Sequence, residues 1–266
     1  MRRISWALVA GALLLPSCRS DAVTLAYQFP QDSSLTYELV ASAKATWNLE
    51  GTTGEGSYEV TYRVSEQVQE SDGEGAVVAI QLQRTAVEED NLPAPGDTSF
   101  TVRVSSDGSV VEVIEVNGVT AGLLAREQRS IIRTYRPQLA LEPVRLYKQW
   151  APEQAFQGSE FEQVKLLGKL AGLDTDEEGD FAELSFSGTG PLLGTAQVAE
   201  YSAELDGALD TSIDAVLDLD AGVLRSSSSF TNYDFDVSIT PEDASSPIAG
   251  TLHIEEKLDL QKIEPG

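Results

Sequence analysis

Few side chains in this sequence could do chemistry, and the rarest are one cysteine, Cys18, and one histidine, His253. A single cysteine excludes an internal disulfide, and a zinc site built from cysteine and histidine would need more of both. His253 lies between Leu252 and Ile254, which alternation directs toward a core, so we expect its imidazole to face solvent. The motifs of serine hydrolases and phosphate-binding loops are absent. We therefore expect a non-enzymatic protein without a cofactor.

Carboxylates gather in the segment 174–180, where Asp174, Asp176 and Glu178 alternate with other residues. Their spacing fits the first positions of a calcium-binding EF-hand loop, but the twelfth position is Ser185, where such loops carry glutamate. The flanking residues read as strands. We expect an acidic hairpin turn without a metal, and a weak divalent-cation site is the alternative.

Cations are concentrated in one stretch of 23 residues, which holds six of them. These are Arg126, Arg129, Arg133, Arg136, Arg145 and Lys148. Two interpretations stay open, because a chain this acidic offers many internal partners. The cluster either pairs with acidic strands of the same chain or binds an anionic headgroup or partner beside a helix.

The N-terminal residues read as an export signal. Arg2 and Arg3 precede an apolar stretch over 4–15 that is too short to span a bilayer comfortably. The sequence Leu15-Pro16-Ser17-Cys18 follows, with an apolar residue at −3 and a small residue at −1 from the cysteine. It resembles the lipobox of bacterial lipoproteins, although Pro16 replaces the usual small residue.

This resemblance implies that residues 1–17 are removed and that Cys18 carries a diacylglycerol and further acylation such as palmitate. The mature chain would then be anchored to a membrane through Cys18 without spanning it. Residues 18–22 would form a lipidated tether. In a cell with two membranes, Arg19 in place of aspartate after Cys18 implies the outer membrane of the cell envelope.

The charge of the chain restricts its partners. The formal net charge is −25, and loss of residues 1–17 removes two arginines and no acid, which leaves 16 basic and 43 acidic side chains and a charge of −27. Such a surface repels phosphate backbones, so we exclude nucleic acid as the main partner.

Strict alternation of apolar and polar residues dominates the rest of the sequence and predicts a mainly β, antiparallel fold. In 35–49 the odd positions are apolar and the even positions mostly polar. Strands this long favour a curved, half-barrel-like sheet. Turns are expected at 51–56, 71–75, 106–109 and 187–194. The expected strands are 23–29, 35–50, 57–70, 75–87, 98–105, 109–117, 160–172, 180–188, 194–206, 208–220, 222–239 and 249–263.

One segment, 119–135, has helical spacing and is expected to be a single α-helix covering the sheet near the middle of the chain. Leu124, Ile131 and Tyr135 would face the sheet, and Arg129 and Arg133 would lie at the rim, so these five are the speculative ligand-binding residues. The irregular segment 137–158 follows. The helix and this connection, 119–158, divide a β half at 23–118 from a second at 159–266, and we expect both halves to form one domain.

The mature chain resembles uncharacterised β-rich bacterial lipoproteins and, more distantly, half-barrel carriers of lipids or lipoprotein acyl chains. The likeness rests on 25–30 (Leu-Ala-Tyr-Gln-Phe-Pro), Tyr37, the Asp107-Gly108 hairpin and the long strands of the second half. It implies a cup-shaped sheet that binds a lipid or other hydrophobic ligand. The alternative is a structural or protein-interaction module with a filled core.

Overall fold

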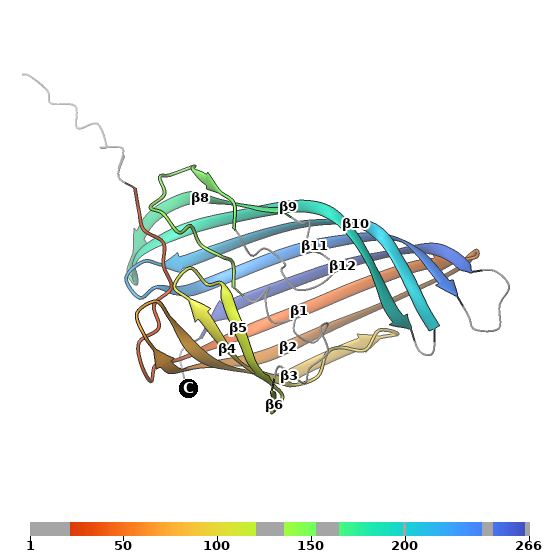
Figure 1. Cartoon of the computed structure of the whole chain (residues 1–266), viewed down its shortest axis with the longest axis horizontal. Helices are drawn as coiled ribbons and strands as arrows, with labels where there is room; N and C mark the ends of the chain where they lie inside the picture. The colour runs from red at the N-terminus through yellow and green to blue at the C-terminus, as the bar shows by residue number, and fades with distance from the viewer. Residues whose placement is uncertain (1–21, 121–135, 153–164, 199–200, 241–246, 264–266) are drawn as a thin grey trace, which may run out of the picture.

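The computed structural model describes residues 22–120, 136–152, 165–198, 201–240 and 247–263. In these residues twelve strands form one open, curved antiparallel sheet, with the order β6-β5-β4-β3-β2-β1-β12-β11-β10-β9-β8-β7 (Figure 1). The strands are β1 (Ser34–Leu49), β2 (Thr52–Ser71), β3 (Gly75–Asp90), β4 (Thr98–Ser105), β5 (Val110–Val116), β6 (Val119–Thr120), β7 (Gln149–Trp150), β8 (Lys165–Asp176), β9 (Gly179–Val198), β10 (Tyr201–Asp218), β11 (Val223–Thr240) and β12 (Ile248–Lys262).

The first and last long strands of the chain are neighbours at the centre of the sheet. β1 pairs with β12 over thirteen residue pairs, from Tyr37–Lys262 to Leu49–Gly250. The two β-rich halves of the sequence therefore share one ladder of hydrogen bonds. The mainly β, antiparallel, curved sheet predicted from alternation is confirmed.

The sheet has two chemically different faces. The inner face carries the apolar residues of each alternating strand, such as Tyr37, Leu39 and Ala41 in β1, which are buried. The outer face carries the polar residues of the same strands, and Glu38 and Lys44 of β1 are exposed there. Successive side chains of a strand point to opposite faces, so the alternation of apolar and polar residues determines which residues lie on each face of the sheet.

One end of the sheet, which we call the near end, is closed on its inner face by two irregular segments. It is the end with the β2–β3, β8–β9 and β10–β11 turns. Leu25 and Tyr27 from the N-terminal segment, together with Leu139 and Val144 from 136–148, pack into the main hydrophobic core. Val23 and Val144 form backbone hydrogen bonds in both directions, at 2.7 and 2.9 Å.

Several expected boundaries are wrong. The segment 23–29 makes only an isolated bridge and joins no strand ladder. The turn expected at 51–56 is confined to Glu50 and Gly51, with φ of 48° and 85°, and β2 already begins at Thr52. The segment 187–194 is no turn, because β9 runs unbroken from Gly179 to Val198, and β10 likewise passes straight through 206–208. Glycine and proline usually end a strand, but here the strands continue across them.

The start of the expected covering helix is also wrong. Val119 and Thr120 form strand β6, paired with Val116 and Glu115 of β5. Asn117 and Gly118 make the intervening turn with φ of 49° and 77°, the backbone that an Asn-Gly hairpin requires. The remainder of that prediction, 121–135, lies outside the described residues. Within the described ranges, no helix is long and apolar enough to cross a bilayer.

Candidate ligand-binding face

A row of polar and small side chains crosses the inner face at mid-sheet. Neighbouring strands place its members directly opposite one another, in the order Tyr58, Ala43, Glu256, Thr231, Thr211 and Gly188. Thr231 and Thr211 are buried, and their hydroxyls form a hydrogen bond of 2.8 Å. We call this set the polar row.

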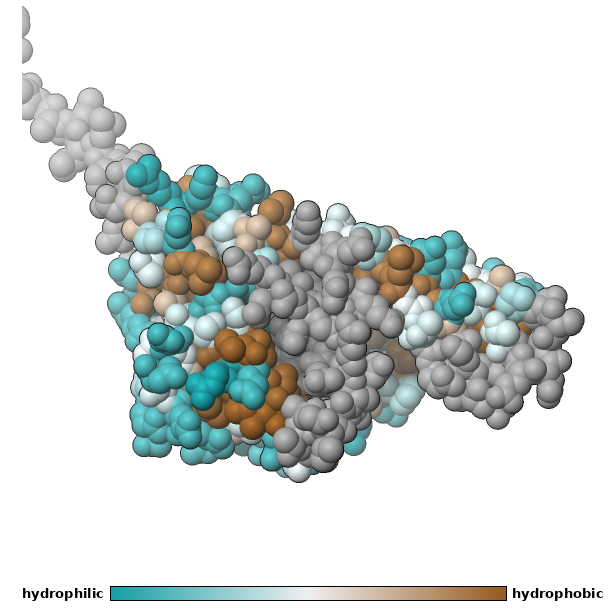
Figure 2. Space-filling view, in the orientation of Figure 1, coloured by the Kyte–Doolittle hydropathy of each residue, from teal (hydrophilic) through white to brown (hydrophobic). Residues whose placement is uncertain are grey.

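The polar row separates two apolar clusters on the same face. On the near side lies the main core, which includes Val60, Ala41 and Leu258. On the other side lies a smaller cluster of Leu192, Ala203, Leu209, Phe235 and Val237, with Leu205, Tyr233, Ile239, Leu252 and Ile254 packed against it. We call this second set the far cluster. Apolar surface of the molecule is visible over β9 and β10 in Figure 2.

Both clusters combine fully buried and partly buried side chains, and Leu192, Ala203 and Leu209 of the far cluster are at most 3% exposed. In the main core Tyr37, Val60, Val64 and Leu170 are at most 2% exposed. In the far cluster, Leu205, Tyr233, Ile239, Leu252 and Ile254 are only partly buried. The apolar inner face therefore continues well beyond the main core.

Glu256 is the acidic member of the polar row. Its Oε2 accepts a hydrogen bond of 2.9 Å from the Tyr233 hydroxyl. Burial raises the pKa of Glu256, and the bond from Tyr233 only partly offsets this. Burial together with the nearby Glu256 carboxylate also raises the pKa of Tyr58, to about 12. No ion pair joins Glu256 to a cation among the residues that the structure describes.

The other buried acid of this face, Glu66, has a cation for a partner. Arg136 forms a short ion pair with Glu66 Oε2, and both side chains are at most 7% exposed. The guanidinium also lies over the rings of Tyr27 and Phe29, 5.3 and 5.2 Å from their centroids. Glu66 and Arg136 thus fasten the segment after 135 onto the sheet. For Arg136, internal pairing with an acidic strand is what the structure shows.

The five residues predicted from the sequence to bind a ligand, Leu124, Ile131, Tyr135, Arg129 and Arg133, lie outside the described residues, as does Cys18. Arg126 is also outside them. Arg145 and Lys148 are described and exposed, on the irregular segment before β7.

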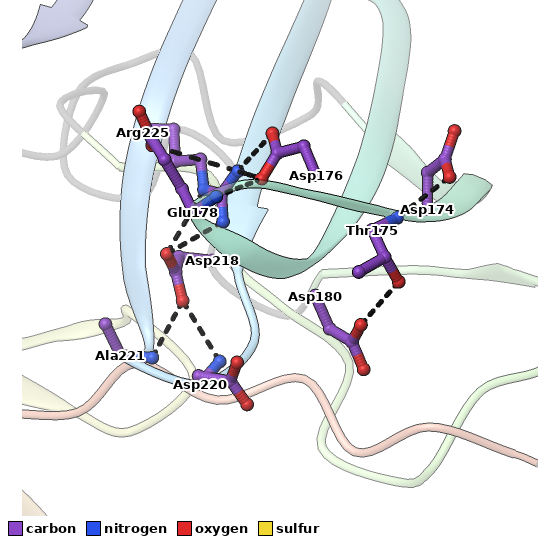
Figure 3. A network of polar contacts seen from close by, with 9 residues as sticks. All are labelled: Asp174, Thr175, Asp176, Glu178, Asp180, Asp218, Asp220, Ala221 and Arg225. Atoms are coloured by element: carbon purple, nitrogen blue, oxygen red, sulfur yellow. Dashed lines mark hydrogen bonds and ion pairs between the residues drawn. The ribbon is translucent and has the colours of Figure 1, made fainter.

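The acidic residues 174–180 form the β8–β9 hairpin, and Figure 3 shows how they are engaged. Asp176 makes two hydrogen bonds, at 2.9 and 2.8 Å, to Nη1 of Arg225, whereas Asp174 accepts from the Thr175 amide. Glu178 is 3.9 Å from Arg225. No group of three potential metal ligands occurs in the described part of the chain.

Arg225 joins this hairpin to its neighbour. It also contacts Asp218 through Nε at 3.1 Å and Nη2 at 3.0 Å, and Asp218 accepts the backbone amides of Asp220 and Ala221. One arginine therefore fixes the β8–β9 and β10–β11 turns to each other. Hydrogen bonds from Arg225 hold the pKa of Asp176 below its usual range.

His253 projects from the outer face, as expected from its position between Leu252 and Ile254. Its side chain is 39% exposed, and its Nδ1 lies 2.7 Å from Asp234 Oδ1. The acidic stripe of β10 is on the same face, where Asp206, Asp210 and Asp214 are exposed.

Sequence reasoning missed Glu256 although the sequence carried a signal for it. In 252–260 the even positions Leu252, Ile254, Leu258 and Leu260 are apolar and inward, so the acid at 256 interrupts the inward phase. Two consecutive glutamates in a strand must also point to opposite faces. Glu255 is outward and exposed, and Glu256 is inward.

Comparisons with known proteins place the chain in no family. No family model matches it, and no curated protein matches its sequence. Among solved structures, a lipovitellin structure described as "Lipid-protein interactions in lipovitellin" covers 88% of this chain at 10% identity and a TM-score of 0.46. The chain spans 25% of that protein's length.

A second solved structure that matches is Pseudomonas aeruginosa OpdQ. It covers 87% of this chain and 99% of its own, at 5% identity and a TM-score of 0.24.

Proposed function

We propose that this chain is a membrane-anchored bacterial envelope lipoprotein that holds a lipid or other hydrophobic ligand against the inner face of its sheet and catalyses no reaction. The lipid on Cys18 would place it on the outer face of a membrane, which is the outer membrane in a cell that has two. The ligand would lie on the far cluster.

The observation that carries this proposal is that five of the ten side chains of the far cluster are only partly buried, namely Leu205, Tyr233, Ile239, Leu252 and Ile254. Strands of 15–20 residues extend the apolar face past the main core, so the partly buried leucines and isoleucines of the far cluster lie together on one face of the sheet. Full burial of an exposed side chain of this kind is worth about 1.5–3 kcal/mol, so an apolar ligand that completes the burial of these side chains would supply a part of that for each.

The near end favours the alternative, a structural or protein-interaction module. Leu25, Tyr27, Leu139 and Val144 are buried against its inner face. A ligand site is thus confined to the part of the sheet beyond the polar row. A measurement of ligand binding there distinguishes a lipid-binding protein from a structural or protein-interaction module.

The test uses the mature chain, residues 18–266, carrying Cys18→Ser, and the neutral apolar dye Nile red. Leu252→Asn changes the far cluster, and the matched control Thr251→Asn changes the next residue, which is exposed on the outer face. We expect Nile red to bind the parent and Thr251→Asn equally and Leu252→Asn about tenfold more weakly, the factor that corresponds to ~1.4 kcal/mol. Absence of binding to a folded parent would favour the structural module.

A further inference from the structure

The inner face presents an apolar surface and a polar one side by side, in fixed order along the strands. Ile254, Tyr233 and Leu209 belong to the far cluster, and each is two residues from Glu256, Thr231 or Thr211 of the polar row. From Thr231 to Ile239 the far part of β11 spans about 26 Å at ~3.3 Å per residue. A ligand filling this surface would be apolar along most of its length and polar at the end that meets the row.

The chemistry of the polar row selects the head of such a ligand. Glu256 uses Oε2 to accept the Tyr233 hydroxyl, and its Oε1 accepts no hydrogen bond from any described residue. A carboxylate oxygen is an acceptor only, so it needs a donor. In its ionised form Glu256 would repel a second anion, because no described cation is paired with it.

The hydroxyls of the row do not alter this preference. Thr211 and Thr231 are engaged with each other at 2.8 Å. Tyr58 of β2, which lies opposite Ala43 of β1, is the other titratable group of the row. Like any tyrosine it is uncharged at neutral pH, and burial raises its pKa further, to about 12. The row therefore offers one carboxyl group, whose Oε1 is hydrogen-bonded to no described residue, together with neutral hydroxyls.

We propose that the polar row is the head-group subsite for an amphiphile whose head donates hydrogen bonds, with a primary ammonium preferred over an alcohol and a carboxylate disfavoured, while its alkyl chain covers the far cluster. This inference rests on the proposed function, since it names the class of ligand held there. Glu256 is the residue that distinguishes the heads.

Three probes with the same tail test it: dodecylamine, dodecanol and dodecanoate, each below its micelle-forming concentration. Each displaces Nile red from the Cys18→Ser mature chain near pH 7.5. The amine should bind about tenfold more tightly than the carboxylate, equivalent to ~1.4 kcal/mol, with the alcohol between them. Glu256→Gln should bring the three affinities together, whereas the outer-face control Glu255→Gln should leave the order unchanged.

Two further measurements keep the test decisive if Glu256→Gln folds poorly. Tyr233→Phe removes the donor to Oε2 and should preserve or enlarge the preference for the amine. Lowering the pH should reduce the amine-to-alcohol ratio, because burial raises the pKa of Glu256 and the carboxylate is neutralised before exposed glutamates. Tyr58 and Tyr233, the other titratable groups facing Glu256, stay neutral over that range.

The outcomes separate the two proposals. If a folded protein binds neither Nile red nor any dodecyl probe, the proposed function fails. If the probes bind with equal affinity, or if Glu256→Gln keeps the preference of the parent, the head-group assignment is overturned and the proposed function stands.

Discussion

Trp47 of β1 and Gly54 of β2 lie directly opposite each other on the inner face, and the indole occupies the space where a side chain at residue 54 would be. A Cβ on Gly54 would lie 2.4 Å from Trp47 Cε2 and Cζ2. Trp150 and Gly168 repeat the arrangement across β7 and β8, with the same 2.4 Å approach to Cε2. Aromatic rings over strand glycines are a known means of restoring packing that glycine lacks.

We predict that Gly54→Ala will displace the Trp47 indole. The overpacking should lower the free energy of unfolding by about 1–3 kcal/mol, and the tryptophan fluorescence should change. Gly96→Ala is the matched control, because a Cβ at Gly96 meets nothing within 4 Å. An unchanged emission spectrum in Gly54→Ala would show that the ring does not cover residue 54.

Arg225→Met should destabilise the near end. It leaves the buried Asp218 carboxylate without its cation, and removing one partner of a buried pair costs about 3 kcal/mol or more. Asp176→Asn should cost less, because Asp176 is 47% exposed and Arg225 keeps its ion pair with the buried Asp218. Denaturant melts compare the two, and equal losses would contradict the central role of Asp218.

Asp107 should make stability depend on acid pH. Burial alone would raise its pKa, but hydrogen bonds from Ser105, Ser109 and Gln138 outweigh burial and hold the pKa below 3.8. A depressed pKa contributes stability above the unfolded-state value and loses it as the pH falls through the folded-state value, between about pH 5 and about pH 2.

Asp107→Asn should therefore lose less stability than the parent when melts are repeated from about pH 5 to about pH 2. Asp210→Asn, an exposed outer-face change, is the control and should follow the parent curve. If Asp107→Asn also follows the parent curve, Asp107 is not the group responsible.

Cys18→Ser should release the protein from the membrane fraction without unfolding it, because the proposed anchor is the lipid on Cys18, which precedes every strand of the sheet in the sequence. Fractionation followed by a high-salt wash measures this. Retention of the variant in the washed pellet would contradict anchoring through Cys18.

The class of the fold could be predicted from the sequence because the alternation in 35–49 and 205–219 leaves only one face for a core. The boundaries could not, because Gly188, Gly190 and Pro191 look like a turn although they continue the ladder opposite Thr211, Leu209 and Ala208. Whether a glycine ends a strand or continues it depends on pairing with the neighbouring strand, which the local sequence does not show.

The candidate site was predicted less well. The alternation in 205–219 indicates which face of β10 is apolar, and Leu205 and Leu209 of the far cluster lie on that face, but the five ligand-binding residues predicted from the sequence lie outside the described residues. The polar row was missed, because Tyr58, Glu256, Thr231 and Thr211 come from four strands and meet only through the register of the sheet. Asp176 was considered as a metal ligand because nothing local revealed Arg225, 49 residues away.

Native mass spectrometry of the mature chain carrying Cys18→Ser, produced in its host and purified without detergent, tests the central claim most directly. The account predicts a noncovalent adduct with the mass of a lipid or other amphiphile, which is retained in Thr251→Asn and lost in Leu252→Asn. A folded parent that shows only the mass of its own chain would contradict ligand binding on the far cluster.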